Sequence, residues 1–327
     1  MKKRLLSGIQ STGKIHLGNY FGAIKNWIAL QKEYDAYFMV ADLHALTTSY
    51  EDGINIKNNN YELIADLIAC GIDTENATLF LQSQVPEHCE LHLFLSMIAP
   101  LPWLLRVPTY KSKQEELKHK DLNTYGFLGY PVLQAADILL YQADIVPIGK
   151  DQAPHLELTR EIVRRFNHLY KKSFFKEPEE MYTEIPILPG TDGRKMSKSY
   201  DNAIYLADDS DTIDKKLRRM ITDPARMRRT DPGNPAKCPV YNFQKIFNQE
   251  ITKELAAGCR TAGIGCIDCK KKLIPKITDF IAPIKEKRET LLKDKAQLEK
   301  IIKVGVKKSR ETAAKTVRQV KRIIKLI

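Results

Sequence analysis

The sequence contains no long hydrophobic run. Nowhere in its 327 residues does an apolar stretch approach the roughly 20 residues that a transmembrane helix needs. The first ten residues, MKKRLLSGIQ, are basic but lack an apolar segment long enough for a secretory signal. These absences argue against a membrane-spanning helix and against secretion, and they predict that the protein acts in the cytoplasm.

The sequence also lacks the GxxxxGK(S/T) pattern of P-loop proteins, so any nucleotide site must be built from other motifs. Its hydrophobic content of 43% and charged content of 28% are ordinary for a globular protein. The length predicts two domains with enough residues to bury a substantial core.

Positive charge is concentrated in the C-terminal third. The net charge is +12, and residues 237–327 carry 23 lysines and arginines against 9 aspartates and glutamates. The remainder of the chain is nearly neutral. A basic region of this kind predicts a polyanionic partner, most simply RNA or DNA. The alternative is a lysine-rich helical surface exposed to water, and charge alone does not decide between the two.

Strand and helix patterns alternate along the N-terminal part. Short apolar segments typical of buried strands lie at 4–9, 37–41 and 78–81. Apolar residues at helical spacing begin near His16 and recur at Tyr61–Cys70, and Gly71 is expected to end this second helix. This alternation predicts an α/β fold, a doubly wound parallel (Rossmann-type) sheet in residues 1–200. Residues 201–327 are expected to form a mainly helical domain.

Ligands of such sheets bind beyond the carboxyl ends of the strands, where the turn at Gln10–His16 and the segment Asp42–His44 are expected. The first motif in this region is GIQSTGKIHLGNY, residues 8–20. Its glycines allow close approach of a ligand, and Gly18 leaves room for a flat group. His16 and Asn19 stand at a helix start, where free N–H groups favour anions.

The second motif is PGTDGRKMSKSY, residues 189–200. Its glycines predict a mobile turn that carries Lys195 and Lys198, and such a loop can close on a polyphosphate. The alternative is an exposed basic turn. The first motif lies roughly 180 residues before this one and directly follows a predicted strand. The two motifs together therefore favour a nucleotide site.

A carboxylate in an apolar segment marks a third candidate. Asp137 lies among hydrophobic residues of the stretch 130–152, and a buried carboxylate needs a hydrogen-bonding partner. One interpretation is a structural aspartate bonded to backbone or arginine. The other is an acceptor for a donor on a mostly apolar ligand, such as an indole N–H. Asp151, which precedes a predicted helix, is suited to hydroxyl contacts.

Two of the six cysteines, Cys70 and Cys89, are isolated in apolar surroundings and are expected in the core. The other four follow the spacing C-x20-C-x6-C-x2-C, at Cys238, Cys259, Cys266 and Cys269. Four thiols without histidine suit one soft metal centre, either zinc or a four-iron, four-sulfur cluster. The alternative is four small core residues of a helical domain.

Together the motifs resemble the class I aminoacyl-tRNA synthetases, whose two ATP-binding motifs correspond to HLGN (16–19) and KMSKS (195–199). The family's general pattern has histidine where this chain has Asn19, and the tryptophan-specific branch shares that asparagine. The segments GIQ, AADILLY and GKDQ extend the resemblance to the bacterial members of this branch over essentially the whole chain.

The resemblance implies roles for individual residues. The ATP-binding positions are Gln10, His16, Gly18, Asn19, Lys111, Lys113, Asp151, Lys195 and Lys198, with His16, Lys195 and Lys198 catalytic. The tryptophan-binding positions are Asp137 for the indole N–H, Tyr130 and Gln152 for the head group, Val146 and Ile148 as pocket walls, and His44. Gln134 and Leu6 stand where the branch has Met and Phe, which leaves the packing around the indole open.

The implied activity is a two-step acyl transfer. Tryptophan and ATP, with Mg²⁺ on the phosphates, form an adenylate and pyrophosphate, and tryptophan then passes to the 3′-terminal ribose of its tRNA. The resemblance also implies a homodimer and favours the iron–sulfur cluster over zinc. Alternatives are a tyrosine-specific enzyme, a small-molecule nucleotidyltransferase, and a non-catalytic paralogue acting as an RNA-binding or iron–sulfur sensor.

Overall fold

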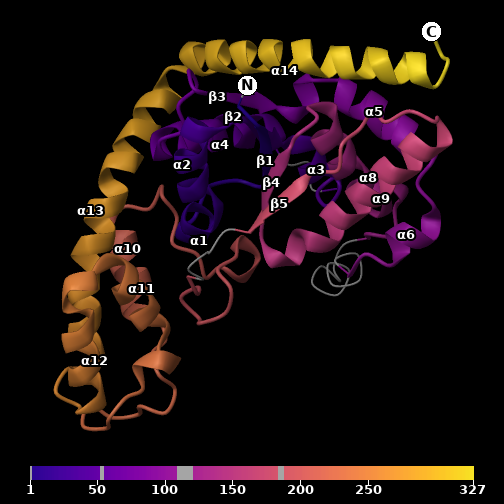
Figure 1. Ribbon diagram of the computed structural model, residues 1–327. Coiled ribbons are helices and arrows are strands. Elements are labelled where there is room, and N and C mark those ends of the chain that lie inside the picture. Colours follow the sequence, from indigo (N-terminus) through magenta and orange to yellow (C-terminus); the bar gives the residue numbers. More distant parts are fainter. Residues whose placement is uncertain (1, 52–54, 109–120, 183–187) are drawn as a thin grey trace.

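The computed structural model describes residues 2–51, 55–108, 121–182 and 188–327 (Figure 1). The strands are β1 (Arg4–Gln10), β2 (Asp35–Ala41), β3 (Ala77–Leu81), β4 (Ile145–Ile148) and β5 (Glu179–Tyr182). The helices are α1 (Leu17–Asn19), α2 (Lys25–Glu33), α3 (Asp42–Leu46), α4 (Ile56–Cys70), α5 (Glu87–Ser96), α6 (Leu101–Leu105), α8 (Tyr125–Leu140), α9 (Ala153–Leu169), α10 (Ser210–Arg219), α11 (Pro239–Phe247), α12 (Thr252–Arg260), α13 (Cys266–Lys293) and α14 (Lys295–Ile323). None of the helices in these ranges is long and apolar enough to cross a membrane.

The five strands form one parallel sheet in the order β3-β2-β1-β4-β5. The order reverses between β1 and β4, and ligands of such sheets bind in the crevice at that reversal. The predicted doubly wound α/β fold is therefore confirmed, and the three predicted strands correspond to β1, β2 and β3.

Alternating side chains of the inner strands enter two separate cores. Leu5 and Phe38 pack in one apolar cluster with Ile64 of α4. Their neighbours Leu6 and Tyr37 pack in the other cluster, which contains residues of α8 and α9. Because successive side chains of a strand point to opposite faces, a strand covered by helices on both sides is apolar throughout.

The predicted helix stop is confirmed, and the first helix is more irregular than predicted. Gly71 ends α4 with a left-handed φ of 118°, which glycine adopts without steric cost. The helical run that starts at Leu17 passes through a π-helical segment, Tyr20–Ile24, before α2 begins. Such single-turn π segments are often found near functional sites.

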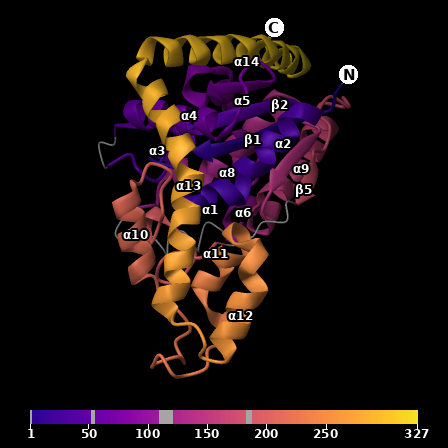
Figure 2. The same ribbon diagram turned by 90° about the vertical axis from the view of Figure 1, so that its left-hand side faces the viewer.

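The C-terminal residues form a helical lobe and two long helices, α13 and α14. Figures 1 and 2 show α10, α11 and α12 in the lobe, α13 running from it to the sheet, and α14 beyond. Helix α14 packs against β3 and α5, and a Cβ on Gly305 would lie 1.8 Å from the Leu79 carbonyl oxygen. The edge strand of the sheet is thus covered by a helix. The division of the chain after residue 200 stays a prediction.

Candidate active site

A cavity of about 340 Å³ opens at the reversal between β1 and β4. Its lining includes predicted site residues from several segments: Gln10, His44, Tyr130, Asp137, Val146, Ile148 and Gln152. Leu6 and Gln134, the two departures from the family pattern, line it as well. The structure therefore brings together all the residues that were assigned to the amino acid.

Helix α8 presents a polar row to this cavity. Tyr130, Gln134 and Asp137 are spaced by four and three residues, so they share one face of the helix. Asp137 is 1% exposed, and its neighbours Ala136 and Ile138 are buried in the apolar core.

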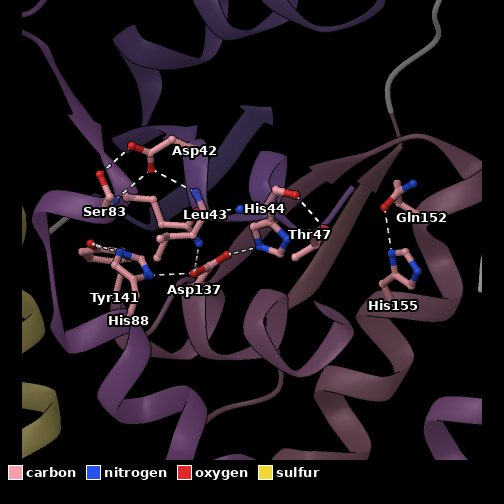
Figure 3. Close-up of polar contacts among 11 residues, drawn as sticks. Asp42, Leu43, His44, Thr47, Ser83, His88, Asp137, Tyr141, Gln152 and His155 are labelled. Carbon is pink, nitrogen blue, oxygen red and sulfur yellow. Dashed lines mark hydrogen bonds and ion pairs between the residues drawn. The ribbon is translucent and has the colours of Figure 1, made fainter. Parts of the chain in front are cut away.

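Side chains from three other segments engage the Asp137 carboxylate (Figure 3). Oδ1 accepts hydrogen bonds from Gln82 Nε2 at 2.8 Å and from His88 Nδ1 at 2.6 Å. Oδ2 accepts one from His44 Nε2 at 2.7 Å. Burial alone would raise the pKa of Asp137, but hydrogen bonds and charge interactions with His44 and His88 outweigh it and lower the pKa to about 2. The carboxylate is therefore ionised at neutral pH.

A second buried carboxylate holds the loop that carries Gln82. Asp42 accepts a hydrogen bond from the Ser83 backbone N–H at 2.9 Å (Figure 3). It accepts another from Asn60 Nδ2 at 2.9 Å. These contacts tie α3, which carries His44, to the 3-10 turn Gln82–Gln84 that follows β3. The predicted location of Asp42–His44 at the carboxyl end of a strand is confirmed.

At the opposite end of the cavity, His155 joins two of the assigned residues. Its Nδ1 lies 2.9 Å from Gln152 Oε1 and its Nε2 lies 3.0 Å from the Tyr130 hydroxyl oxygen. Because a carbonyl oxygen only accepts, Nδ1–H donates to Gln152, and Nε2 forms a second hydrogen bond with the Tyr130 hydroxyl. Asp151 is exposed, outside the cavity lining, and accepts from Gln152 Nε2 at 3.1 Å.

His16 caps the first helix with a reciprocal pair of hydrogen bonds. Its Nδ1 accepts from the Asn19 backbone N–H at 3.1 Å, and Asn19 Oδ1 accepts from the His16 N–H at 3.2 Å. Burial, then the charges of Lys198 and Lys195, lower the pKa of His16 to about 4. The imidazole is neutral at pH 7, and since Nδ1 accepts, its proton is on Nε2.

The two nucleotide motifs contact each other directly. The Gly18 N–H points at Met196 Sδ across 3.3 Å, and Lys198 Nζ lies 3.4 Å from Thr12 Oγ1. Backbone hydrogen bonds join the segments on both sides of this contact, from Leu17 to Ile204 and from Leu206 to Ile15. Burial lowers the pKa of Lys198 to about 8, whereas Lys195 is exposed.

Asn202 holds the base of the KMSKS loop. Its Oδ1 accepts from the Ser197 N–H at 2.8 Å, and its Nδ2 donates to Asp192 and to the Lys195 carbonyl. A Cβ on Gly190 would approach Asn202 Nδ2 to 2.2 Å, so glycine is required where this side chain crosses the turn. Lys111 and Lys113 lie outside the described residues.

Four residues of the site were missed from the sequence: Gln82, His88, Tyr141 and His155. Gln82 directly follows β3, so the rule of strand carboxyl ends, which was applied to β1 and β2, also predicts its position. His88 and His155 lie inside helices, at positions that give no local signal of contact with the site.

The four clustered cysteines lie where the helical lobe meets α13. Cys238 precedes α11, Cys259 lies in α12, and Cys266 and Cys269 are in the first turn of α13. Burial raises the pKa of Cys269 to about 11, with contributions from the other three thiols. Gln244 Nε2 lies 3.3 Å from Cys269 Sγ. Across the described ranges, however, no three His, Cys, Asp or Glu side chains are arranged to hold a metal ion.

Of the two isolated cysteines, Cys70 is buried, as predicted, but the prediction for Cys89 is wrong, because its side chain is exposed. The inward face of α5 is occupied by His88, Leu91 and Leu95, which places Cys89 on the solvent side.

Comparison with known proteins agrees with this arrangement. Residues 1–282 match the family model described as tRNA synthetases class I (W and Y). The chain is 50% identical over 307 residues to a tryptophan–tRNA ligase of Thermotoga maritima, covering 93% of each chain. It is 43% identical over 373 residues to that of Ralstonia nicotianae, again with 93% of each covered.

A solved structure is similar over nearly the whole chain. It is tryptophanyl-tRNA synthetase from Campylobacter jejuni in complex with ADP and tryptophan, with a TM-score of 0.88 and 34% identity, covering 98% of this chain and 99% of that one. The fold, the cavity at the β1/β4 reversal and the paired HLGN and KMSKS motifs fit the same assignment. The chain belongs to the tryptophan and tyrosine family of class I tRNA synthetases.

Proposed function

We infer that the chain is a tryptophan–tRNA ligase, which activates L-tryptophan with ATP and transfers it to the 3′-terminal ribose of its tRNA. The observation that carries this inference is a mostly apolar cavity at the β1/β4 reversal that contains one ionised carboxylate, Asp137. The relatives from Thermotoga maritima and Ralstonia nicotianae carry the same activity in their names.

Tryptophan recognition rests on shape and one polar contact. The walls formed by Leu6, Val146 and Ile148 suit a large flat hydrophobe. Indole has a single N–H and no acceptor, which matches a carboxylate oxygen in an apolar cavity. Tyr130 and Gln152, held by His155, stand at the far end of the lining, where the amino acid head group would bind.

Adenylate formation needs no side-chain base, because the tryptophan carboxylate is already a nucleophile. It attacks the α-phosphorus of ATP and pyrophosphate leaves, so catalysis comes from positioning and charge stabilisation. Lys195 and Lys198, with the substrate's Mg²⁺, offset the charge on the departing pyrophosphate. His16 offers an Nε2–H donor to phosphate oxygens.

The remaining residues that the family resemblance assigns to ATP lie at three places in the structure. Gln10 lies at the end of β1 and lines the cavity. Gly18 and Asn19 belong to the first helical turn. Asp151 is exposed beside the start of α9, which suits contacts with ribose hydroxyls.

The role of Asp137 is tested by Asp137→Ala. The variant should raise the tryptophan KM in pyrophosphate exchange by about 100-fold or more, because the buried contact that selects the N–H is lost. The ATP KM should change little. Asp144→Ala removes a carboxylate outside the cavity lining and is the control. Equal increases in both KM values for Asp137→Ala would refute the assignment.

For the four cysteines we propose a four-iron, four-sulfur cluster, with zinc as the alternative. Four thiolates suit either centre, and the four cysteines all lie at the start of, or within, the consecutive helices α11, α12 and α13. Its role would be structural or in positioning RNA. Protein purified without oxygen should contain iron and sulfide and absorb broadly at about 400 nm. Stoichiometric zinc without this absorbance would favour the alternative.

The proposed partners are tRNA and a second copy of the chain, in the cytoplasm. The basic C-terminal third supports RNA binding, with Lys315 and Arg318 exposed on α14. Exposed apolar side chains lie along α5 and α6, namely Leu93, Met97, Leu101 and Leu105, and they support a dimer contact. Sedimentation equilibrium should give twice the monomer mass, and a monomer at micromolar concentration would argue against the dimer.

A further inference from the structure

Two fully buried residues act on Asp137 from outside the cavity. His88 and Tyr141 are each 0% exposed, and neither belongs to the cavity lining. His88 Nδ1 lies 2.6 Å from Asp137 Oδ1, and its Nε2 lies 2.8 Å from the Tyr141 hydroxyl oxygen. Figure 3 shows the three side chains in a row, with the His88 ring between Asp137 and Tyr141.

A hydrogen bond at each ring nitrogen holds His88 in place. An ionised carboxylate only accepts, so His88 Nδ1–H donates to Asp137. Nε2 forms the other hydrogen bond, with the Tyr141 hydroxyl. Tyr141 thereby fixes the orientation of the His88 ring.

The two oxygens of Asp137 are consequently not equivalent. Oδ1 accepts from both Gln82 and His88, which occupies its two lone pairs. Oδ2 accepts from His44 alone among the hydrogen bonds of the described residues. His44 lines the cavity, whereas Gln82 and His88 do not. The acceptor site left for a ligand is therefore on Oδ2, on the side of the cavity.

We propose that His88, backed by Tyr141, is a positioning residue for amino acid selection, which holds Asp137 Oδ1 so that Oδ2 faces the indole N–H. This role rests on the proposed function, because it requires tryptophan in the cavity. His88 does not touch the substrate. It acts by preventing rotation of the carboxylate and by keeping it ionised within an apolar core.

The test compares tryptophan with its isostere β-(3-benzothienyl)alanine, in which sulfur replaces the indole N–H. Pyrophosphate exchange with the wild-type protein should favour tryptophan. In His88→Leu the tryptophan KM should rise about tenfold or more, since one charge-assisted hydrogen bond is lost. The KM for the isostere, which makes no such contact, should change by less than about threefold. The discrimination between the two compounds therefore falls.

Two further variants separate positioning from packing. His88→Asn keeps an N–H donor near the position of Nδ1 and should restore most of the discrimination. Tyr141→Phe keeps the ring but removes the hydroxyl that orients His88, so it should lower discrimination less than His88→Leu does. If His88→Leu fails to fold, the comparison of Tyr141→Phe with the wild type decides the proposal.

His92→Leu is the matched control, because His92 lies one turn further along α5 and its Nδ1 has no hydrogen-bond partner among the described residues. It should leave discrimination unchanged. Equal losses for both compounds in His88→Leu, or unchanged discrimination in Tyr141→Phe and His88→Leu, would overturn the proposal. Absence of tryptophan-dependent exchange in the wild-type protein would instead contradict the proposed function itself.

Discussion

At the scale of single residues, Lys198 is the most informative titratable group at the phosphate end of the site. It is the lysine of the KMSKS motif that contacts the turn after β1, through Thr12. Partial burial lowers its pKa to about 8, so a fraction of the side chain is already neutral at slightly alkaline pH. An incoming polyphosphate would supply the anion that stabilises its charged form.

The pH dependence of ATP use should follow this lysine. Its ammonium form exists below the pKa, so kcat/KM for ATP in pyrophosphate exchange should fall as pH rises through about 8. Lys198→Arg keeps its charge throughout this range and should abolish the falling limb, even if its maximal rate is lower. An unchanged alkaline limb in that variant would assign the titration to another group.

His16 should add no step to the same pH profile near neutrality, because its pKa of about 4 leaves it neutral from pH 6 upward.

The motif containing His16 and the candidate role of Asp137 could both be predicted from the sequence, since each stands out locally. The hydrogen-bond partners of Asp137 could not be predicted from the sequence. Its partners Gln82 and His88 lie 55 and 49 residues away along the chain, and only the fold brings them together.

At the scale of elements, α14 rests unusually close to the sheet. Gly305 is buried in the middle of this helix, where the helix backbone approaches the Leu79 carbonyl of the edge strand β3. A glycine in a helix interior costs roughly 1 kcal/mol relative to alanine. The close contact with β3 accounts for its presence here.

Gly305→Ala should therefore destabilise the protein although it improves helix propensity. The added Cβ would lie 1.8 Å from a backbone oxygen, so α14 must move away from β3, at a cost of about 1–3 kcal/mol. Chemical denaturation measures the change in unfolding free energy. Gly126→Ala on α8, where the added Cβ meets nothing within 4 Å, is the control and should be neutral or stabilising.

Helical spacing of apolar residues predicts helices over 273–327, with Val317, Val320 and Ile324 facing inward, and α13 and α14 cover most of this range. Val317 and Val320 are buried, as predicted, whereas Ile324, just beyond α14, is only partly buried. The partner of that face could not be predicted, because an apolar stripe specifies burial without specifying what covers it. The close approach of α14 to β3 leaves no room for a Cβ at Gly305, and nothing in the sequence around this glycine predicts that requirement.

At the scale of the whole molecule, α13 connects the helical lobe to the nucleotide site. Arg288 of α13 is buried and pairs with Asp66 of α4, and also with Glu62 at 3.2 Å. Asp66 Oδ2 in turn accepts from the Ile15 N–H at 3.0 Å, immediately before His16. One ion pair thus joins the C-terminal helices to the HLGN motif.

Arg288→Leu should lower the unfolding free energy by about 3–5 kcal/mol, because it leaves a buried carboxylate without its cation. Burial already raises the pKa of Asp66, opposed by Arg288. Without Arg288 the pKa rises further, so the loss should be larger at pH 8 than at pH 5, where the carboxyl group takes up a proton more readily. Lys287→Leu on the exposed face is the control, and an equal effect of both variants would contradict this role.

The parallel sheet and the helical C-terminal part could be predicted from the alternation of patterns along the chain. The long-range ion pair could not, because Asp66 and Arg288 lie 222 residues apart and nothing in either local sequence identifies the other as its partner. The arrangement of the four cysteines likewise depends on how α11, α12 and α13 meet.

The central claim is that this cavity selects tryptophan for adenylate formation, and pyrophosphate exchange tests it most directly. Purified protein with ATP, Mg²⁺ and labelled pyrophosphate should show exchange that depends on added L-tryptophan, with tyrosine supporting it at least about 1000-fold less efficiently. Exchange that tyrosine supports as well as tryptophan, or folded protein that forms no adenylate with either amino acid, would contradict the account.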